Sequence, residues 1–375
     1  MPESANLAEL VCHCRQAWAS KPSVPDPSRS MEKHSVAICF VHHAIAGLRA
    51  RGIAPEPVLQ AAGIAPALLA VPQARVSAAS YSALWMEVAA ALDDEFFGQD
   101  SRRMKCGSFA MLCHAIVGSK TLGQGLERVV RYFGLLLDDI RVRLEREGVD
   151  GEPGAGKRAR AALVLTATSS QPPGVFAQET MLIMLHGLMS WLLRRRVPVL
   201  LAAFSYPEPA YAAEYRLMYS RHLAFGQPAT ALVFDAAWLD QPVHQDERSL
   251  KAFLRDAPHN VVVKYTDRTS VMARVRRQLR AQPPEQWPTF DRLAHDVHMS
   301  SSSLRRRLME EGGTYQQLKD EMRRDLAIEA LSHSSRPLAQ IAAELGFAEP
   351  GAFHRAFRRW TGLRPGAYRG TPSQA

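Results

Sequence analysis

The sequence has 375 residues, of which 47% are hydrophobic and 22% charged, values that exclude a disordered or fibrous chain. Its net charge is +9, and the 112 residues from Lys264 onward carry 19 lysines and arginines against 12 acidic residues. Seven of the nine net positive charges therefore lie in this last part, which predicts a nearly neutral region followed by one that binds a polyanion such as a nucleic acid.

The chain begins with a segment that predicts little structure. Residues 1–33 are rich in proline and serine and show little periodicity, so we expect a disordered tail. Met31 directly precedes the first helical pattern, and translation starting there is an alternative. The five cysteines form no regular framework, and Cys12-His13-Cys14 lacks the second pair that a zinc site needs. We therefore expect reduced thiols in the cytoplasm and no bound metal.

Residues 34–250 predict an α+β domain, mostly helical and with about four strands. Alternation in "DDIRVRLERE" and the apolar run "RAALVLTAT" predict a hairpin across a glycine-rich link. The longest apolar run, residues 181–193, is shorter than the roughly 20 residues of a spanning helix, so we expect no membrane partner. The expected helices are 35–51, 77–92, 109–117, 122–137, 176–196 and 210–219, and the other strands are 199–205 and 231–234.

A linker is expected at residues 251–266. The pattern of the residues after it predicts helices separated by short turns. Residues 267–370 therefore predict an all-α domain. In "FDRLAHDVHMSSSSLRRRLMEEGG" a short apolar helix is followed by a tight turn and a second helix. Leu304 and Leu308 face inward in that second helix, while the side chains on its other face point outward, namely Ser302, Arg305, Arg306 and Met309. This is the pattern of a helix-turn-helix motif, whose second helix is presented to DNA.

The segment "LAQIAAELGFAEPGAFHRAFRRWTG" repeats the motif. Its first helix matches the earlier one at an offset of 48 residues, and its second at an offset of 49. In the second helix an apolar stripe of Phe353, Ala356, Phe357 and Trp360 lies opposite the basic and imidazole side chains. We expect Glu349 to cap this helix, Pro350 to take its first position and Gly362 to end it. Solvated basic faces are the alternative, but two such motifs in tandem favour DNA binding.

The connector between the two motifs predicts one continuous helix over residues 315–332. At 1.5 Å per residue its length is roughly 27 Å. Successive major grooves on one face of DNA lie ~34 Å apart. A rigid helix of this length can hold two recognition helices in adjacent grooves.

On these residues the last ~100 positions resemble the DNA-binding domain of the AraC/XylS transcriptional regulators. The closing "GLRPGAYR" is similar to the end of the family signature. The preceding region resembles the arabinose-binding-like sensor of one subgroup, through "TLGQGLERVVRYFGLLLDDIRVRLE" and "EYRLMYSRHLAFGQPATALVFDAAWLDQPV". The resemblance implies an N-terminal effector-binding and dimerisation domain and a C-terminal domain with two helix-turn-helix motifs. It covers roughly residues 35–370.

The resemblance also implies which residues read DNA. Positions that match the family's base-reading residues are Ser302, Arg305 and Arg306 in the first motif and Gly351, His354 and Arg355 in the second. Arg358 and Arg359 are candidates for phosphate contacts. Since Pro350 and Gly351 offer no side-chain hydrogen bonds, we expect the first motif to supply more of the sequence specificity.

For the sensor region we nominate no effector-binding residue. A lone histidine or tryptophan on a helix is more often packed in the core than part of a ligand site. This applies to His42, His43, His114, His186, Trp85 and Trp191.

The expected function is a sequence-specific, effector-responsive regulator, an activator on family grounds. Its expected partners are double-stranded DNA, a small organic effector, RNA polymerase and a second copy of the chain. The main rival is a DNA-binding domain attached to an enzyme, as in Ada-like repair proteins, which need a four-cysteine zinc cluster that this sequence lacks. The sequence shows no nucleophile elbow, phosphate-binding loop or dinucleotide fingerprint, so we expect no enzyme and no cofactor. A third reading is a chromosomal protein that binds DNA without sequence preference.

Overall fold

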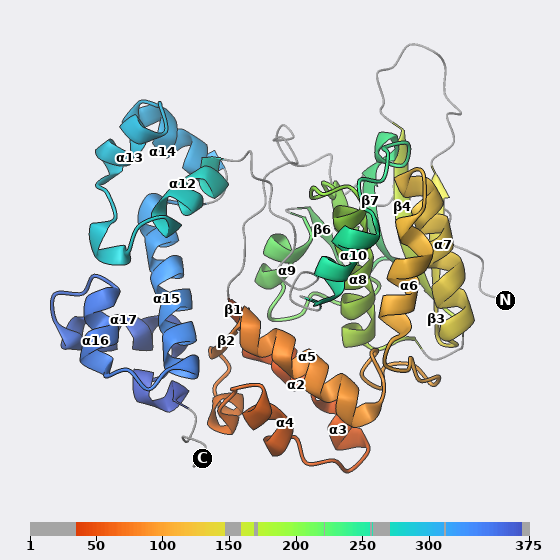
Figure 1. The fold of residues 1–375 in the computed structure, drawn as a ribbon, viewed down its shortest axis with the longest axis horizontal. Coiled ribbons are helices and arrows are strands. Elements are labelled where there is room, and N and C mark those ends of the chain that lie inside the picture. The colour runs from red at the N-terminus through yellow and green to blue at the C-terminus, as the bar shows by residue number, and fades with distance from the viewer. Residues whose placement is uncertain are drawn as a thin grey trace. The chain divides into compact units, whose positions relative to one another are not determined.

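The computed structural model describes residues 35–146, 159–168, 172–220, 222–255, 257, 271–310 and 313–369 (Figure 1). The expected tail and most of the expected linker lie outside these residues. The chain forms two compact units, whose described parts are residues 89–257 in one and residues 35–88 with 271–369 in the other. The boundary falls inside one helix, α5 (Ala78–Leu92). The domain boundaries expected from the sequence stay a prediction.

The first unit is built on a five-stranded sheet with the order β3-β4-β7-β5-β6. The strands are β3 (Ile140–Arg146), β4 (Arg160–Ala167), β5 (Leu201–Ala203), β6 (Leu223–Ala224) and β7 (Thr230–Asp235). The expected hairpin is confirmed, since β3 and β4 pair antiparallel from Ile140 opposite Ala167 to Arg146 opposite Ala161. The fifth strand, β6, was not expected because two residues carry no readable alternation.

Helices pack around this sheet (Figure 1). They are α6 (Ser108–Val117), α7 (Leu122–Leu136), α8 (Val175–Leu192), α9 (Ala213–Met218) and α10 (Glu247–Arg255). Helix α8 is buried on all sides, from Phe176 to Leu192, and its buried side chains include the polar Gln178, Glu179 and His186. It ends four residues earlier than expected, because Arg194 adopts a left-handed φ of 54°. Among the helices that the structure describes, none combines the length and apolar composition that crossing a bilayer requires.

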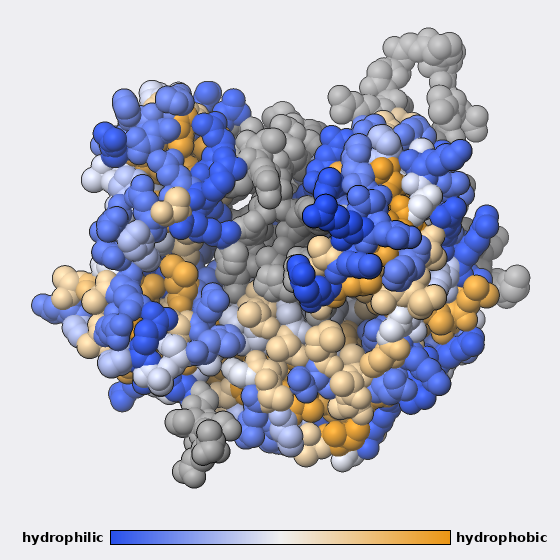
Figure 2. Space-filling view, in the orientation of Figure 1, coloured by the Kyte–Doolittle hydropathy of each residue, from blue (hydrophilic) through white to orange (hydrophobic). Residues whose placement is uncertain are grey.

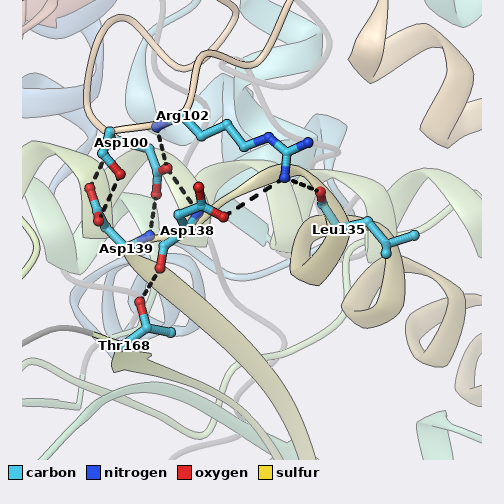
Figure 3. Close-up of polar contacts among 7 residues, drawn as sticks. Asp100, Arg102, Leu135, Asp138, Asp139 and Thr168 are labelled. Carbon is cyan, nitrogen blue, oxygen red and sulfur yellow. Dashed lines mark hydrogen bonds and ion pairs between the residues drawn. The ribbon is translucent and has the colours of Figure 1, made fainter.

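A buried aspartate fastens the loop before α6 to the start of β3 (Figure 3). The carboxylate of Asp100 accepts hydrogen bonds from the main-chain N–H groups of Arg102, Asp138 and Asp139, each at 2.9 Å. The guanidinium of Arg102 donates to the carbonyl oxygen of Leu135 at 3.0 Å, at the last turn of α7. These bonds hold the junction of α7 and β3 in place.

The second unit begins with residues 35–88. They form β1 (Ser35–Ala37), α2 (Ile38–Ala44), α3 (Ala46–Ala50), α4 (Glu56–Ala61), the 3-10 turn η1 (Pro66–Ala70), β2 (Arg75–Ser77) and the start of α5. The expected single helix over 35–51 is wrong in its first turn, and at Ile45 it is divided into α2 and α3. Residues 35–37 instead pair antiparallel with β2, and three residues are too short to reveal a strand in the sequence.

The rest of the second unit is helical, as expected. Its elements are α12 (Val271–Arg280), η3 (Pro284–Gln286), α13 (Phe290–Asp296), α14 (Ser301–Glu310), α15 (Tyr315–His333), α16 (Leu338–Glu344), α17 (Pro350–Thr361) and η4 (Pro365–Tyr368). Helices α12, α13 and α14 share one apolar core with the first half of α15. Helices α16 and α17 lie at the other end of α15 (Figure 1).

Candidate nucleic-acid interface

The two helix-turn-helix motifs have equivalent turns. The main-chain N–H of Met299 donates to the carbonyl oxygen of Ala294 at 2.9 Å, and Phe347, 48 residues on, donates to Ala342 at 3.0 Å. The residue before each donor is left-handed, with φ of 57° at His298 and 76° at Gly346. The sequence offset of 48 thus corresponds to the same backbone turn in both motifs.

Gly346 is required at its turn for two reasons. A Cβ atom there would lie 3.1 Å from the carbonyl oxygen of Pro284 and 3.2 Å from Cα of Glu285, closer than ordinary contacts. A left-handed conformation also costs residues other than glycine roughly 1–2 kcal/mol. His298 occupies the matching place in the first turn and carries that strain.

The two recognition helices, α14 and α17, start differently. The hydroxyl oxygen of Ser300 accepts the N–H of Ser303 at 3.2 Å, a capping bond for α14. Glu349 takes the matching position before α17, but its side chain makes no capping hydrogen bond, so that expectation is wrong. The side chain of Glu is one methylene longer than that of Asp and is disfavoured for this role. The expected positions of Pro350 in the first turn and Gly362 at the end, with φ of 75°, are confirmed.

The outward face of α14 carries the side chains that the sequence placed there. Ser302, Arg305, Arg306 and Met309 are exposed. Leu304 and Leu308 are buried in the core shared with α12, α13 and α15. Figure 2 shows a largely hydrophilic surface over α13 and α14.

Arg305 is held by a contact that the sequence did not reveal. Its guanidinium carbon lies 5.4 Å from the centre of the Phe290 ring, at the start of α13. Cation–π contact of this kind restrains a long side chain at an exposed site. Arg305 is therefore oriented by the first helix of its own motif.

On α17 the apolar stripe packs inward and the basic side chains stay outside. Phe353 and Phe357 are fully buried, while Trp360, expected in the core, is half-buried against Phe347 at a ring distance of 6.1 Å. His354 is half-buried. The other four predicted contact residues are exposed: Gly351, Arg355, Arg358 and Arg359.

The Arg355 guanidinium runs back along the first turn of α17. A Cβ atom at Gly351 would lie 3.5 Å from Nη1 of Arg355, an ordinary van der Waals contact.

The connector α15 is one continuous helix that holds both motifs. It has 19 residues and is about 28 Å long. A capping box starts it, with Thr314 and Gln317 bonding each other's main chain. The expected connecting helix is confirmed.

Arg323, in the middle of α15, contacts the segment just before the first motif and the turn of the second, which sequence reasoning missed. Its guanidinium carbon lies 5.3 Å from the ring of Trp287 and 5.6 Å from that of Phe347. Its Nε donates to the carbonyl oxygen of Leu345 at 2.9 Å. Burial lowers the pKa of Arg323 from its usual value. The sequence pattern does not single out Arg323, since Lys319 lies one turn earlier on the same face of α15, and it does not identify the partners.

Of the histidines and tryptophans considered for a ligand site in the first unit, His186 and Trp191 are packed, whereas His114 is exposed. Nε2 of His186 lies 2.8 Å from the carbonyl oxygen of Val197, and the ring of Trp191 stacks on Phe253 at 4.5 Å. In the part of the chain that the structure describes, histidine, cysteine and acidic side chains form no group of three that could hold a metal ion.

Comparison with known proteins adds two family matches. Residues 52–243 match the arabinose-binding domain of AraC transcription regulators, and residues 293–371 match a helix-turn-helix domain. The chain is 29% identical over 322 residues to the ornithine utilization regulator of Pseudomonas aeruginosa, covering 86% of this chain and 92% of that protein. It is 43% identical over 79 residues to the HTH-type transcriptional regulator VqsM of the same organism, covering 21% and 24%.

The chain is also similar to solved structures. The transcriptional regulator CdpR of Pseudomonas aeruginosa covers 88% of this chain and 98% of its own, with 17% identity and a TM-score of 0.28.

Proposed function

The chain belongs to the AraC family of transcription regulators with an arabinose-binding type of N-terminal domain, and from this premise we propose how it acts on DNA. It is a helix-turn-helix regulator with an N-terminal ligand-binding domain, not an enzyme, and nothing in the matches supports the enzymatic alternative. We infer that each subunit places α14 and α17 in two adjacent major grooves.

The single observation that supports this proposal best is the continuity of α15 between the two motifs. The first end of the helix packs against the first motif through Leu318, which is buried, and the second end contacts α17. The length of α15, about 28 Å, approaches the ~34 Å between successive major grooves.

The exposed arginines divide into base-reading and phosphate-binding candidates. An arginine can bind O6 and N7 of guanine together, which contributes about 1–3 kcal/mol of discrimination per good pair. Arg306 and Arg355 stand at equivalent positions of the two recognition helices, with Arg305 beside the first. Ser302, Gly351 and His354 complete the base-reading set, and Arg358 and Arg359 bind phosphate.

Binding-site selection with purified variants tests this assignment. Arg306→Ala relaxes the base preference in one half-site, and Arg305→Ala has a weaker effect of the same kind. Arg358→Ala weakens binding to all sequences alike and lowers the slope of log affinity against log salt by about one. If only Arg355→Ala relaxes the preference, the first motif is not the main source of specificity. Unchanged selection by every variant would refute DNA reading by these helices.

The sensing half of the proposal concerns the N-terminal domain. A small organic effector binds there, the protein acts as a homodimer in the cytoplasm, and the bound state recruits RNA polymerase to activate transcription. The near-neutral charge of the N-terminal region and its match to a ligand-binding family support this division of labour. Because one relative is named as a regulator of ornithine utilization, ornithine is the first compound to test.

Transcription from a purified DNA template, measured with and without the effector, tests whether effector binding changes the activity of the protein. With RNA polymerase present, the effector raises transcript yield or promoter affinity several-fold. The sensing proposal fails if no compound of the screened class changes either quantity while sequence-specific binding persists.

A further inference from the structure

Residues 35–88 belong to the compact unit of the DNA-binding helices, although the match to the sensor family begins at residue 52. We propose that the loop and strand at residues 71–77 position the second recognition helix, α17, and so set DNA affinity at the half-site that α17 reads. This inference rests on the proposed reading of DNA by α17.

The first contact joins β2 to the C-terminal turn η4. The main-chain N–H of Arg75 donates to the hydroxyl oxygen of Tyr368 at 3.1 Å. The guanidinium of Arg75 donates in turn to the hydroxyl and carbonyl oxygens of Ser35, at 2.9 and 3.0 Å. Since β1 and β2 also pair through their main chains, the N–H that reaches Tyr368 is held in a fixed position.

Tyr368 also contacts the recognition helix α17. Its side chain is 1% exposed, and its ring meets that of Phe357 edge to face, with centres 4.9 Å apart. Phe357 is fully buried on the inner face of α17. Burial raises the pKa of the Tyr368 hydroxyl, which therefore stays protonated and neutral.

A second contact lies at the end of α17. Gly362 ends the helix in a left-handed conformation, and a Cβ atom there would lie 3.1 Å from Oε1 of Gln73 and 3.4 Å from Cγ1 of Val71. The loop before β2 therefore packs directly on the C-terminal cap of α17. Nearby, Ser80 Oγ lies 3.4 Å from Nε2 of His333, the last residue of α15.

These contacts matter for DNA because base recognition tolerates little displacement. Productive contacts require placement within about 0.5 Å, which depends on the residues that support the contacting helix. Helix α17 packs against α15 and α16, and residues 71–77 contact its end at Gly362 and reach it through Tyr368. Residues outside the helix-turn-helix match thus act on base recognition without touching DNA.

The test uses the full chain with Tyr368→Phe, which removes only the hydroxyl. The matched control is Tyr315→Phe in the first motif, where the hydroxyl donates to the carbonyl oxygen of Pro288 at 2.6 Å. Affinity is measured on three duplexes: the selected site, the site with the α17 half scrambled, and the site with the α14 half scrambled. The two variants Arg306→Ala and Arg355→Ala show which half of the site each helix contacts. Arg306→Ala should relax the base preference in the α14 half, and Arg355→Ala in the α17 half.

We expect Tyr368→Phe to weaken binding to the intact site about three- to tenfold, because it removes the hydroxyl that accepts the N–H of Arg75 and also bonds the side chain of Thr361 at the end of α17. The loss persists when the α14 half is scrambled and disappears when the α17 half is scrambled. For Tyr315→Phe, the loss of affinity should persist when the α17 half is scrambled and disappear when the α14 half is scrambled. If Tyr368→Phe merely reduced the fraction of folded protein, its affinity for all three duplexes would fall by the same factor. Either that result or wild-type affinity for all three duplexes overturns the inference. If the wild-type chain itself does not distinguish the intact site from the one with the α17 half scrambled, the proposed function fails instead.

Discussion

At the scale of residues, the arginines of the DNA-binding unit divide by what they touch. Arg276 is 4% exposed and pairs with Glu321 of α15 at 2.6 Å, and Arg323 contacts the rings of Trp287 and Phe347. Arg355, Arg358 and Arg359 instead lie exposed on α17. The positive charge of the last 112 residues therefore serves two purposes, and only part of it is presented to a polyanion.

A residue-scale prediction concerns Asp100. Asp100→Ala leaves three main-chain N–H groups at the α7–β3 junction without their shared acceptor, so local stability should fall by about 2–3 kcal/mol. Amide hydrogen exchange in β3 and β4 measures this loss.

Asp138→Ala is the matched control for that variant. The carboxylate of Asp138 lies 3.8 Å from an exposed partner, Arg102, and such pairs contribute about 0–1 kcal/mol. Equal exchange rates in the two variants would show that the Asp100 bonds do not hold the junction.

At the scale of elements, the length of a pattern decided what the sequence could predict. The helices of both motifs and the connector have apolar spacings sustained over two or more turns, and they lie where the spacing put them. Strands β1, β2 and β6 have two or three residues each, and only pairing with distant segments defines them.

Side-chain detail was predicted less well than the elements. The exposed face of α14 followed directly from the positions of Leu304 and Leu308, since opposite faces of a helix are fixed by its period. The contact of Arg305 with Phe290 and the support of α17 by Tyr368 depend on packing between segments, which no local pattern contains.

An element-scale prediction compares the starts of the two recognition helices. Ser300→Ala removes the hydroxyl that accepts the N–H of Ser303, so α14 should lose about 1 kcal/mol. Hydrogen exchange of the α14 amides should then be roughly fivefold faster.

Glu349→Ala is the corresponding change at α17. Its side chain makes no capping bond, and exchange of the α17 amides should stay within twofold of wild type. A loss at α17 as large as that at α14 would mean that Glu349 caps its helix in solution.

At the scale of the whole molecule, the sensor match and the compact units do not coincide. The family match to the sensor spans residues 52–243, yet residues 35–88 form one unit with the DNA-binding helices. Helix α5 runs across the unit boundary without a break. The segment that supports α17 is thus continuous in the chain with the unit that contains the sheet.

The most direct test of the account changes the spacing between the two half-sites of a selected operator. Because one helix, α15, joins the two motifs, an insertion of half a helical turn, about five base pairs, should reduce affinity to that of a single half-site. An insertion of a full turn should not restore it, since α15 cannot lengthen. Affinity that is independent of spacing, or that returns with a full turn, would contradict the claim that each subunit reads two adjacent major grooves.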